Sequence, residues 1–331
     1  NKMNVLVTGG AGYIGSHCVK ILLEQGYNVS IIDNLSTGYL DAIDKNATFH
    51  NLNIKDLDNV VQVLKEDNID AVIHFAAFSL VGESMEKPLK YYENNVQGTK
   101  MLLEAMKIAD VKHIVFSSTA AVYGDQKVMP ITETMDEKPT NAYGETKLSM
   151  EKMMKWADIA HGIKYIALRY FNVAGAHHTG TIGESHNPET HLIPLILQVP
   201  NKKREFISIF GNEYDTPDGT CIRDYIHIED LIDAHILAMN HLRKTNTSDV
   251  FNLGSGEGYS VLEMIEAARR ATKLPIPSKL APSRAGDPAR LIASSAKAKE
   301  VLGWSPKYTQ VEDIISSAWN FHKTHTDGYK Q

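Results

Sequence analysis

The N-terminal segment VLVTGGAGYIGSHCVKILLEQGYNVSIID constrains the fold more than any other feature, because it reads as strand, glycine turn, helix and second strand. Residues 5–7 are a continuous apolar run, which is typical of a strand buried in a parallel sheet. Gly10, Gly12 and Gly15 follow in G-x-G-x-x-G spacing, and Gly26 ends the helix. In this spacing the first glycine allows a tight turn, the second leaves room for a pyrophosphate, and the third lets helix and strand approach. The segment therefore predicts a dinucleotide-binding unit.

The residue at the end of the second strand indicates which dinucleotide is bound. Asp33 follows Gly15 by 18 residues, where a carboxylate would accept a hydrogen bond from a ribose 2′-hydroxyl. The same carboxylate would repel a 2′-phosphate, and the next residue is Asn34 rather than an arginine. The sequence therefore predicts NAD rather than NADP.

The pattern of strands and helices continues along the chain. Segments 70–75, 113–118 and 163–172 read as buried strands with helical segments between them, and a strand at 250–253 completes the sheet. Such alternation predicts an α/β fold with a doubly wound parallel (Rossmann) sheet. Ligands bind these sheets beyond the carboxyl ends of the strands, so the turns after these strands should line one cleft with the glycine turn.

We expect a smaller α/β substrate domain beside this sheet. The predicted dinucleotide-binding domain comprises residues 1–172 plus 223–256, with a helix around 228–242. The predicted substrate domain comprises residues 173–222 plus 257–331.

Composition excludes several classes of protein. Acidic residues outnumber basic ones by 40 to 34, and this net charge of −6 argues against a nucleic-acid partner. No apolar run approaches the ~20 residues of a membrane span. Cys18 and Cys221 lie far apart in the sequence and form neither a disulfide framework nor a metal-binding pattern. We therefore expect a cytoplasmic protein with no membrane or nucleic-acid partner and no metal.

Three polar residues are candidates for proton transfer. Tyr143 and Lys147 stand four apart at the start of a predicted helix and so share one of its faces. Thr119 follows the strand at 113–118 and would lie at the same edge of the sheet. A phenol with its reference pKa of ~10 is a poor base at neutral pH, but an ammonium and a positive nicotinamide ring nearby favour the phenolate. The spacing alone is common among ordinary helices, so the role depends on the surrounding motifs.

Together, the glycine turn, Asp33, Thr119 and the Y-x-x-x-K pair resemble the extended short-chain dehydrogenase/reductase family. The strings FSSTAAVYG, LRYFNVAGA, DGTCIRDYIHIEDL and SRAGDPARLIASSAKAKEVLGW resemble its nucleotide-sugar 4-epimerase branch, and the resemblance covers nearly the whole chain. It implies a homodimeric, NAD-dependent enzyme that interconverts UDP-glucose and UDP-galactose by inverting C4 of the hexose through a transient 4-keto sugar. Whether N-acetylated UDP-hexoses are also substrates stays open.

The resemblance also implies the residues of the site. Those assigned to catalysis are Tyr143, Lys147 and Thr119. Those assigned to NAD are Gly9, Gly10, Gly12, Tyr13, Ile14, Gly15, Asp33, Asn34, Asn53, Ile54, Phe75, Ala76, Ala77, Ser79, Asn94, Ser117, Tyr143, Lys147, Tyr170 and Phe171. Those assigned to the UDP-hexose are Thr119, Asn172, His191, Leu192, Phe210, Arg223, Tyr225, Arg284, Asp287 and Leu291.

Alternative functions in the same family are less well supported. A 4,6-dehydratase carries Asp-Glu after its threonine, and a decarboxylase usually carries a glutamate before VYG, whereas Ala120 and Ala121 stand here. A non-catalytic NAD-binding sensor would be expected to lack the tyrosine. Leu291 occupies a position where the resembled branch has either tyrosine or a small residue, and the smaller residue admits N-acetylated sugars.

Two further features are expected to have structural roles. His177 and His178 are predicted to lie in a surface loop rather than to bind a metal. The predicted helices at 87–108 and 143–161 would present apolar faces to a second subunit, as the resemblance implies.

Overall fold

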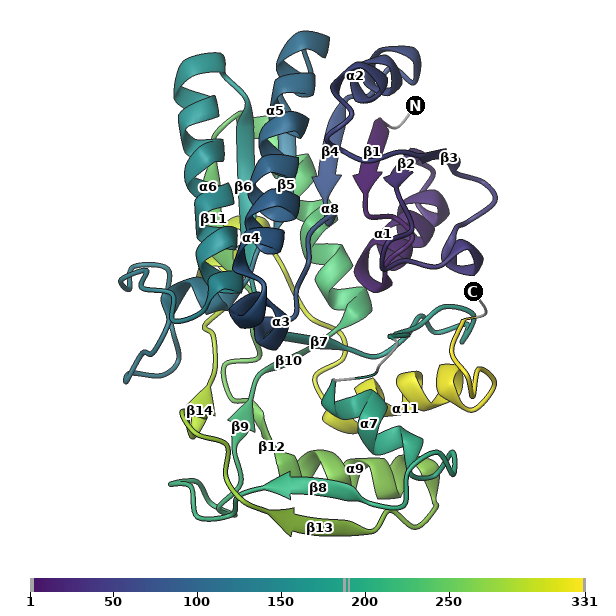
Figure 1. Ribbon diagram of the computed structural model, residues 1–331, viewed down its shortest axis with the longest axis vertical. Coiled ribbons are helices and arrows are strands. Elements are labelled where there is room, and N and C mark those ends of the chain that lie inside the picture. Colours follow the sequence, from purple (N-terminus) through teal and green to yellow (C-terminus); the bar gives the residue numbers. More distant parts are fainter. Residues whose placement is uncertain (1–2, 187–188, 190, 330–331) are drawn as a thin grey trace.

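The computed structural model describes residues 3–186, 189 and 191–329, which form two lobes (Figure 1). The larger lobe contains a seven-stranded sheet in the order β11-β6-β5-β4-β1-β2-β3, and every neighbouring pair is parallel. The strands are β1 (Asn4–Thr8), β2 (Asn28–Asp33), β3 (Thr48–Asn51), β4 (Ala71–His74), β5 (His113–Ser117), β6 (Lys164–Arg169) and β11 (Asp249–Asn252). The strand order reverses between β1 and β4, so the switch point where such sheets bind ligands lies beside the glycine turn.

Helices cover both faces of this sheet. One face is covered by α1 (Tyr13–Glu24) and α8 (Ile228–Thr245), whose buried side chains share a single apolar core with the strands. The other face is covered by α2 (Leu57–Glu66), α5 (Gly98–Ala109) and α6 (Ala142–His161), around a second core. This three-layer arrangement confirms the predicted α/β doubly wound fold.

The helix that carries the candidate tyrosine has well-defined ends. Asn141 caps α6, because its Oδ1 accepts a hydrogen bond from the backbone N–H of Gly144 at 2.8 Å. Gly162 ends the helix with a φ of +66°, a left-handed conformation that glycine adopts without strain. The first turn of α6 is therefore held in one position beside the end of β5.

The smaller lobe gathers elements from two separate stretches of chain, which lie together below the sheet in Figure 1. Its apolar core joins side chains of α7, α9 and α11 with those of β8, and β8 pairs in parallel with β13. A three-stranded sheet of order β12-β9-β14 lies between this core and the larger lobe. The elements are α7 (Leu192–Gln198), β8 (Ile207–Phe210), β9 (Ile222–Arg223), β12 (Tyr259–Ser260), α9 (Val261–Thr272), β13 (Ser278–Ala281), β14 (Arg290–Leu291) and α11 (Val311–His322).

Two predicted elements are interrupted in the structure. The strand expected at 163–172 ends at Arg169, and the chain then forms β7 (Asn172–Ala174), which pairs in parallel with β10 (Tyr225–His227) outside the large sheet. The helix expected at 87–108 is divided into α4 (Pro88–Tyr91), a π-helical turn η2 (Tyr92–Gln97) and α5. Both interruptions lie near the carboxyl ends of the sheet strands, and π-helical turns often occur at functional sites.

The C-terminal segment contacts both lobes. α10 (Ala296–Leu302) and Trp304 belong to the core that α1 and α8 share, although their positions fall in the predicted substrate domain. The domain boundaries therefore stay a prediction. Within the described residues, no helix has the length and apolar character needed to cross a membrane.

Candidate active site

In the glycine turn between β1 and α1, some glycines are required by close packing and one leaves open space for a ligand. Gly9 has a φ of +74°, so the residue in the left-handed conformation is Gly9 rather than Gly10. A Cβ on Gly10 would lie 2.6 Å from Ile31, and a Cβ on Gly15 would lie 2.0 Å from the carbonyl oxygen of Gly9. A Cβ on Gly12 would meet only that same oxygen, at 3.4 Å. Packing within the protein therefore requires glycine at position 15 but does not require it at position 12.

Asp33, at the end of β2, fixes the backbone of the turn. Its carboxylate accepts hydrogen bonds from the N–H of Ala11 at 2.9 Å and from the N–H of Leu35 at 2.7 Å. Burial raises the pKa of this carboxyl group, and the two backbone hydrogen bonds oppose that shift. Since each carboxylate oxygen has a second lone pair, Asp33 can still accept hydrogen bonds from ribose hydroxyl groups.

The structure brings the three predicted catalytic residues together at the end of β5. Thr119 caps the 3₁₀ turn η3 (Ala120–Tyr123), where its hydroxyl accepts from the backbone N–H of Ala121 at 3.0 Å and lies near enough to the Tyr143 phenol to lower the phenol pKa. The Lys147 Nζ donates a hydrogen bond to the carbonyl oxygen of Ser117 at 2.8 Å. The same ammonium lies 5.9 Å from the centre of the Tyr143 ring. A half-buried phenol and a buried hydroxyl and amine therefore share one small region.

Burial shifts the pKa values of this group. Desolvation raises the pKa of Tyr143 to about 12, and the hydrogen bond to Thr119 opposes this shift. Desolvation lowers the pKa of Lys147 to about 7, and the charge of Glu151 opposes this shift. The sequence predicted a lowered pKa for Tyr143, but the protein groups alone raise it. Lowering it would require the additional positive charge of a bound cofactor.

Several residues assigned to the cofactor surround the glycine turn. The backbone N–H groups of Phe75 and Ala76 donate to the Thr8 hydroxyl at 3.1 and 3.3 Å, which holds the end of β4 against β1. The Ser117 and Tyr170 hydroxyl groups are 2.7 Å apart. These contacts place parts of β1, β4, β5 and β6 around one edge of the sheet.

The remaining residues assigned to the cofactor differ in their exposure. Ile54 is buried against the helix start at Gly98, and Asn94 donates to Asn95 at 2.9 Å. Partly buried side chains are those of Tyr13, Ile14, Ala77 and Phe171, whereas Asn34, Asn53 and Ser79 are exposed. The exposed members have no contact with the turn that would confirm their role.

The residues assigned to the substrate form two neighbouring groups. Asn172 and Tyr225 are paired in register between β7 and β10. Arg223 is paired in register with Leu291 between β9 and β14, and its guanidinium lies 3.8 Å from the Asp287 carboxylate. Arg284 stacks over the ring of Phe210, with 3.9 Å from the guanidinium carbon to the ring centre. The second group therefore offers two guanidinium groups, which suit a diphosphate.

Comparison with protein-family models gives a match of residues 5–254 to the NAD dependent epimerase/dehydratase family. This chain belongs to that family. Curated members similar to it include the UDP-glucose 4-epimerase of Lactobacillus helveticus, 56% identical over 328 residues and 99% of each chain. The UDP-glucose 4-epimerase of Bacillus subtilis is 44% identical over 337 residues, again over 99% of each chain.

Solved structures of the NAD dependent epimerase/dehydratase family have the same fold. A crystal structure of UDP-glucose 4-epimerase matches with a TM-score of 0.98 and 55% identity, over 99% of this chain and 100% of that one. The Bifidobacterium longum enzyme, solved in complex with NAD⁺ and UDP, matches with a TM-score of 0.91 and 39% identity over 98% and 100%. The predictions of an epimerase family and of NAD as cofactor are thereby confirmed.

The glycine turn fits the cofactor of the NAD dependent epimerase/dehydratase family. The backbone N–H groups at the start of α1 have no side-chain cap, and Gly12 leaves the space in front of them open. We expect Gly12→Ala to keep the fold but to weaken NAD binding about 10- to 100-fold, because its methyl group would occupy the place of the pyrophosphate. Titration of the cofactor-stripped protein with NAD measures this change.

Gly15→Ala is the matched control for that substitution. Its Cβ would lie 2.0 Å from the Gly9 carbonyl oxygen, so we expect it to lower the free energy of unfolding by about 1–3 kcal/mol or more. Equal NAD affinity in the wild type and the folded Gly12→Ala variant would contradict the assignment of Gly12 to the cofactor.

Sequence reasoning missed a buried ionic group beneath the catalytic residues. Glu151 lies one turn beyond Lys147 on α6, and its carboxylate accepts from Arg169 Nε at 3.0 Å and from Nη2 at 2.5 Å. It also accepts from the Ser118 hydroxyl at 2.6 Å. The signal available in the sequence was the spacing Y-x-x-x-K-x-x-x-E, which places all three side chains on one helical face. Glu151 and Arg169 therefore position the helix and the β5 end from which the catalytic residues project.

The prediction that both histidines of the pair at 177–178 lie on the surface is wrong for His177. This side chain is fully buried, and its ring nitrogens lie 2.8 Å from the Thr179 hydroxyl and 3.0 Å from the Glu24 carboxylate. Its backbone N–H donates to the His17 ring at 3.1 Å. Partners from α1, far away in the sequence, therefore hold His177 inside the molecule, while His178 is exposed.

The last two residues assigned to the substrate lie at the start of α7. His191 precedes the helix, Leu192 is its first residue, and the His191 Nδ1 lies 2.5 Å from a Glu184 carboxylate oxygen.

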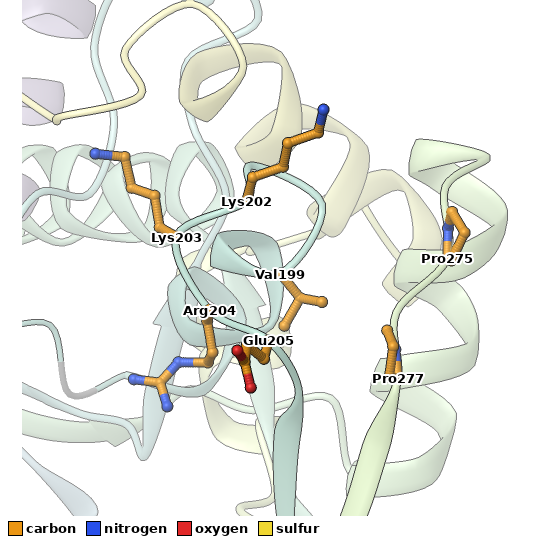
Figure 2. Close-up of a pocket in the computed structure, with 7 residues that line it drawn as sticks. All are labelled: Val199, Lys202, Lys203, Arg204, Glu205, Pro275 and Pro277. Atoms are coloured by element: carbon orange, nitrogen blue, oxygen red, sulfur yellow. The ribbon is translucent and has the colours of Figure 1, made fainter.

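A cavity of about 420 Å³ in the smaller lobe has no predicted site residue in its lining (Figure 2). Its lining residues are Val199, Lys202, Lys203, Arg204, Glu205, Pro275 and Pro277.

Proposed function

We propose that this protein interconverts UDP-glucose and UDP-galactose by inverting C4 of the hexose through a transient 4-keto sugar. The observation that carries the proposal is the grouping of Tyr143 with the buried Thr119 and Lys147 at the end of β5, where the Lys147 ammonium lies 5.9 Å from the centre of the phenol ring. The names of the similar proteins support the same activity. NAD, when bound, would accept a hydride from C4 and return it to the opposite face of the sugar.

The protein groups have distinct roles in this reaction. Tyr143 accepts the proton of the sugar 4-hydroxyl and later returns one, so it acts in turn as base and acid. Thr119 holds that hydroxyl in line with the phenol. Lys147 holds the ribose of the cofactor and stabilises the phenolate through its charge. Because the cofactor returns to its starting state in each cycle, it should stay bound.

The UDP portion would lie in the groups around β9 and β14. Arg223 and Arg284 would bind the diphosphate and Asp287 the uridine ribose. The 3.8 Å pair between Arg223 and Asp287 keeps one guanidinium beside the carboxylate, with its remaining donors available for phosphate oxygens.

A coupled assay tests the proposed activity directly. Purified protein is given UDP-galactose without added NAD, and the appearance of UDP-glucose is followed. We expect turnover without added cofactor. A 4-keto-6-deoxy product would instead support a dehydratase, and no conversion would support a non-catalytic NAD-binding protein.

Leu291 is proposed to set the range of sugars accepted. Its strand partner is Arg223, so its side chain belongs to the predicted substrate group, where it is half-buried. We expect Leu291→Tyr to spare turnover of UDP-galactose and to reduce any turnover of UDP-N-acetylgalactosamine about tenfold or more, because the larger ring would exclude the acetamido group. Parallel assays on the two substrates measure this, and equal losses on both would contradict the assignment.

We also propose that the protein forms a homodimer through α4, η2 and α6. The side chains of Leu89, Tyr92, Trp156 and Ile159 are exposed on these helices, and Leu89 is 81% exposed. Exposed apolar side chains on neighbouring helices favour an interface with a second subunit. A monomer mass by light scattering would refute this proposal. A cytoplasmic location stays a prediction, supported by two buried free cysteines.

A further inference from the structure

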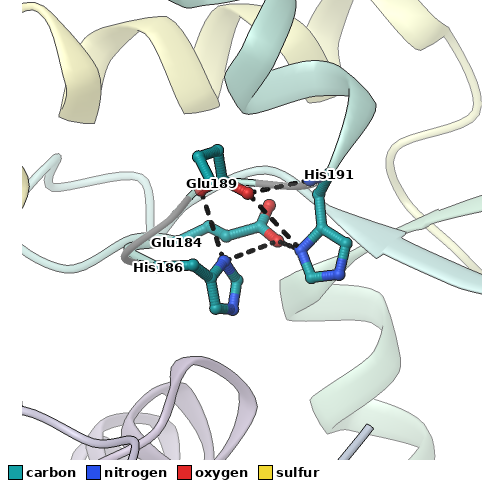
Figure 3. A group of neighbouring side chains, drawn as sticks. All are labelled: Glu184, His186, Glu189 and His191. Carbon is teal, nitrogen blue, oxygen red and sulfur yellow. Dashed lines mark hydrogen bonds and ion pairs between the residues drawn. The ribbon is translucent and has the colours of Figure 1, made fainter. Parts of the chain in front are cut away.

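A cluster of four side chains lies in the segment between β7 and α7, and three of them have no role in the proposed reaction. It consists of Glu184, His186, Glu189 and His191, which we call the His-Glu cluster (Figure 3). One nitrogen or carboxylate oxygen from each residue lies within 4.8 Å of the others. All four residues lie between positions 184 and 191 of the sequence.

The distances between these donor atoms match those around a small metal ion. The His186 Nδ1 lies 3.6 Å from a Glu184 oxygen and 3.3 Å from a Glu189 oxygen. The His191 Nδ1 lies 2.5 Å from Glu184 and 3.8 Å from Glu189. Four ligands at about 2.0–2.2 Å from a tetrahedral ion are separated from one another by about 3.3 Å. A small rearrangement that opens the contact between His191 and Glu184 and shortens the two longer separations would therefore complete the coordination.

Burial and charge favour a cation at this point. The side chains of Glu184 and Glu189 are only 6% and 7% exposed. In the described part of the chain, the ion-pair partners of Glu184 are His186 and His191. Holding two carboxylates this close in a buried site is costly unless a positive charge compensates them.

We propose that the His-Glu cluster binds one divalent transition-metal ion, with Zn²⁺ as the best match. Two imidazole nitrogens and two carboxylate oxygens form a common type of donor set for zinc, whereas calcium and magnesium prefer oxygen ligands alone. Glu184, His186 and Glu189 also line a cavity of about 400 Å³, which gives an ion access from solvent.

The ion would order the segment that leads into α7. In Figure 3 the second ring nitrogen of His191 points away from the cluster. With Nδ1 bound to the metal, that Nε2 would carry the proton and become a hydrogen-bond donor. The ion would therefore fix the tautomer and ring orientation of a residue that is also assigned to the substrate.

The amount of zinc bound per chain tests the proposal independently of enzymatic turnover. The full-length protein is stripped with a chelator, dialysed against a zinc salt and then against metal-free buffer, and analysed by plasma mass spectrometry. We expect one equivalent of zinc per chain in the wild type and affinity weakened about 100-fold or more in Glu184→Gln and His186→Gln. We also expect saturating zinc to raise the Tm of the wild type by a few degrees and to leave that of the two variants unchanged.

The chain offers a matched control in its second histidine-carboxylate group. Donor atoms of Glu24, His177 and His178 also lie within 4.8 Å of one another, so His178→Gln removes a histidine from a comparable cluster elsewhere. We expect this variant to retain its zinc. Wild-type protein without bound zinc, wild-type affinity in Glu184→Gln and His186→Gln, or loss of the ion in His178→Gln would overturn the proposal.

A spectroscopic probe keeps the test decisive if a variant fails to fold. Wild-type protein loaded with Co²⁺ in place of zinc should give the intense visible absorption of a four-coordinate ion with nitrogen and oxygen ligands. Weak bands typical of a six-coordinate ion would overturn the proposed geometry.

Discussion

Replacing Tyr143 with phenylalanine should reduce turnover by about 10²–10⁴-fold or more while leaving NAD bound. The substitution removes only the hydroxyl that exchanges a proton with the sugar, and the half-buried ring keeps its place in the first turn of α6. The coupled assay on UDP-galactose measures the loss, and the absorbance of NAD released by denaturation counts the cofactor.

A second variant tests whether a hydroxyl group alone is what position 119 requires. Thr119→Ser keeps a hydroxyl at the position that bonds to the Tyr143 phenol, so its turnover should stay within about tenfold of the wild type. Near-normal turnover in Tyr143→Phe would show that another group transfers the proton, and loss of NAD from that variant would point to a structural role instead.

Glu151→Gln should lower the free energy of unfolding by about 1–3 kcal/mol, because it removes the buried carboxylate of Arg169 and leaves only the more exposed Glu137 carboxylate as its charged partner. The side chains of Glu151 and Arg169 are each 5% exposed, so water cannot replace the lost interaction. Chemical denaturation measures this effect. Glu145→Gln on the same helix is the control, and we expect it to cost less than about 1 kcal/mol.

The same substitution should shift the pH dependence of turnover. The pKa of Lys147 is lowered to about 7 by burial, and the Glu151 charge opposes that shift, so removal of this charge lowers the pKa further. If turnover requires the ammonium form, activity is lost as the pH rises through this pKa. The alkaline limb of the pH profile should therefore move to lower pH in Glu151→Gln, and an unchanged profile would indicate that Glu151 has no influence on Lys147.

Much of the fold could be predicted from local sequence patterns. The apolar runs of the strands, the glycine spacing and the Tyr143–Lys147 pair depend on neighbouring residues, and each is found at its expected element. The interruption after β6 depends on distant contacts, because the Tyr170 carbonyl accepts a hydrogen bond from the N–H of Ala120. The pattern of apolar and polar residues within 163–172 does not predict that contact.

The buried polar residues were the hardest to predict for the same physical reason. His177 is held by Glu24 and His17, which lie more than a hundred residues earlier in the chain. Glu151 and Arg169 lie on different elements, and each alone reads as an ordinary surface charge. Charged side chains are buried only when the fold supplies partners, and partners on other elements cannot be identified from local pattern.

The C-terminal segment has a consequence for how the molecule unfolds. Trp304 belongs to the core beneath α8, and its ring N–H donates to the carbonyl oxygen of Asp230 at 2.9 Å. The Ser295 hydroxyl likewise donates to the carbonyl oxygen of Gly254 at 2.9 Å. A fragment that stopped after the last strand of the large sheet would expose this core to water. The larger lobe therefore depends on residues 295–304 for its own stability, and the two lobes should melt as one cooperative unit.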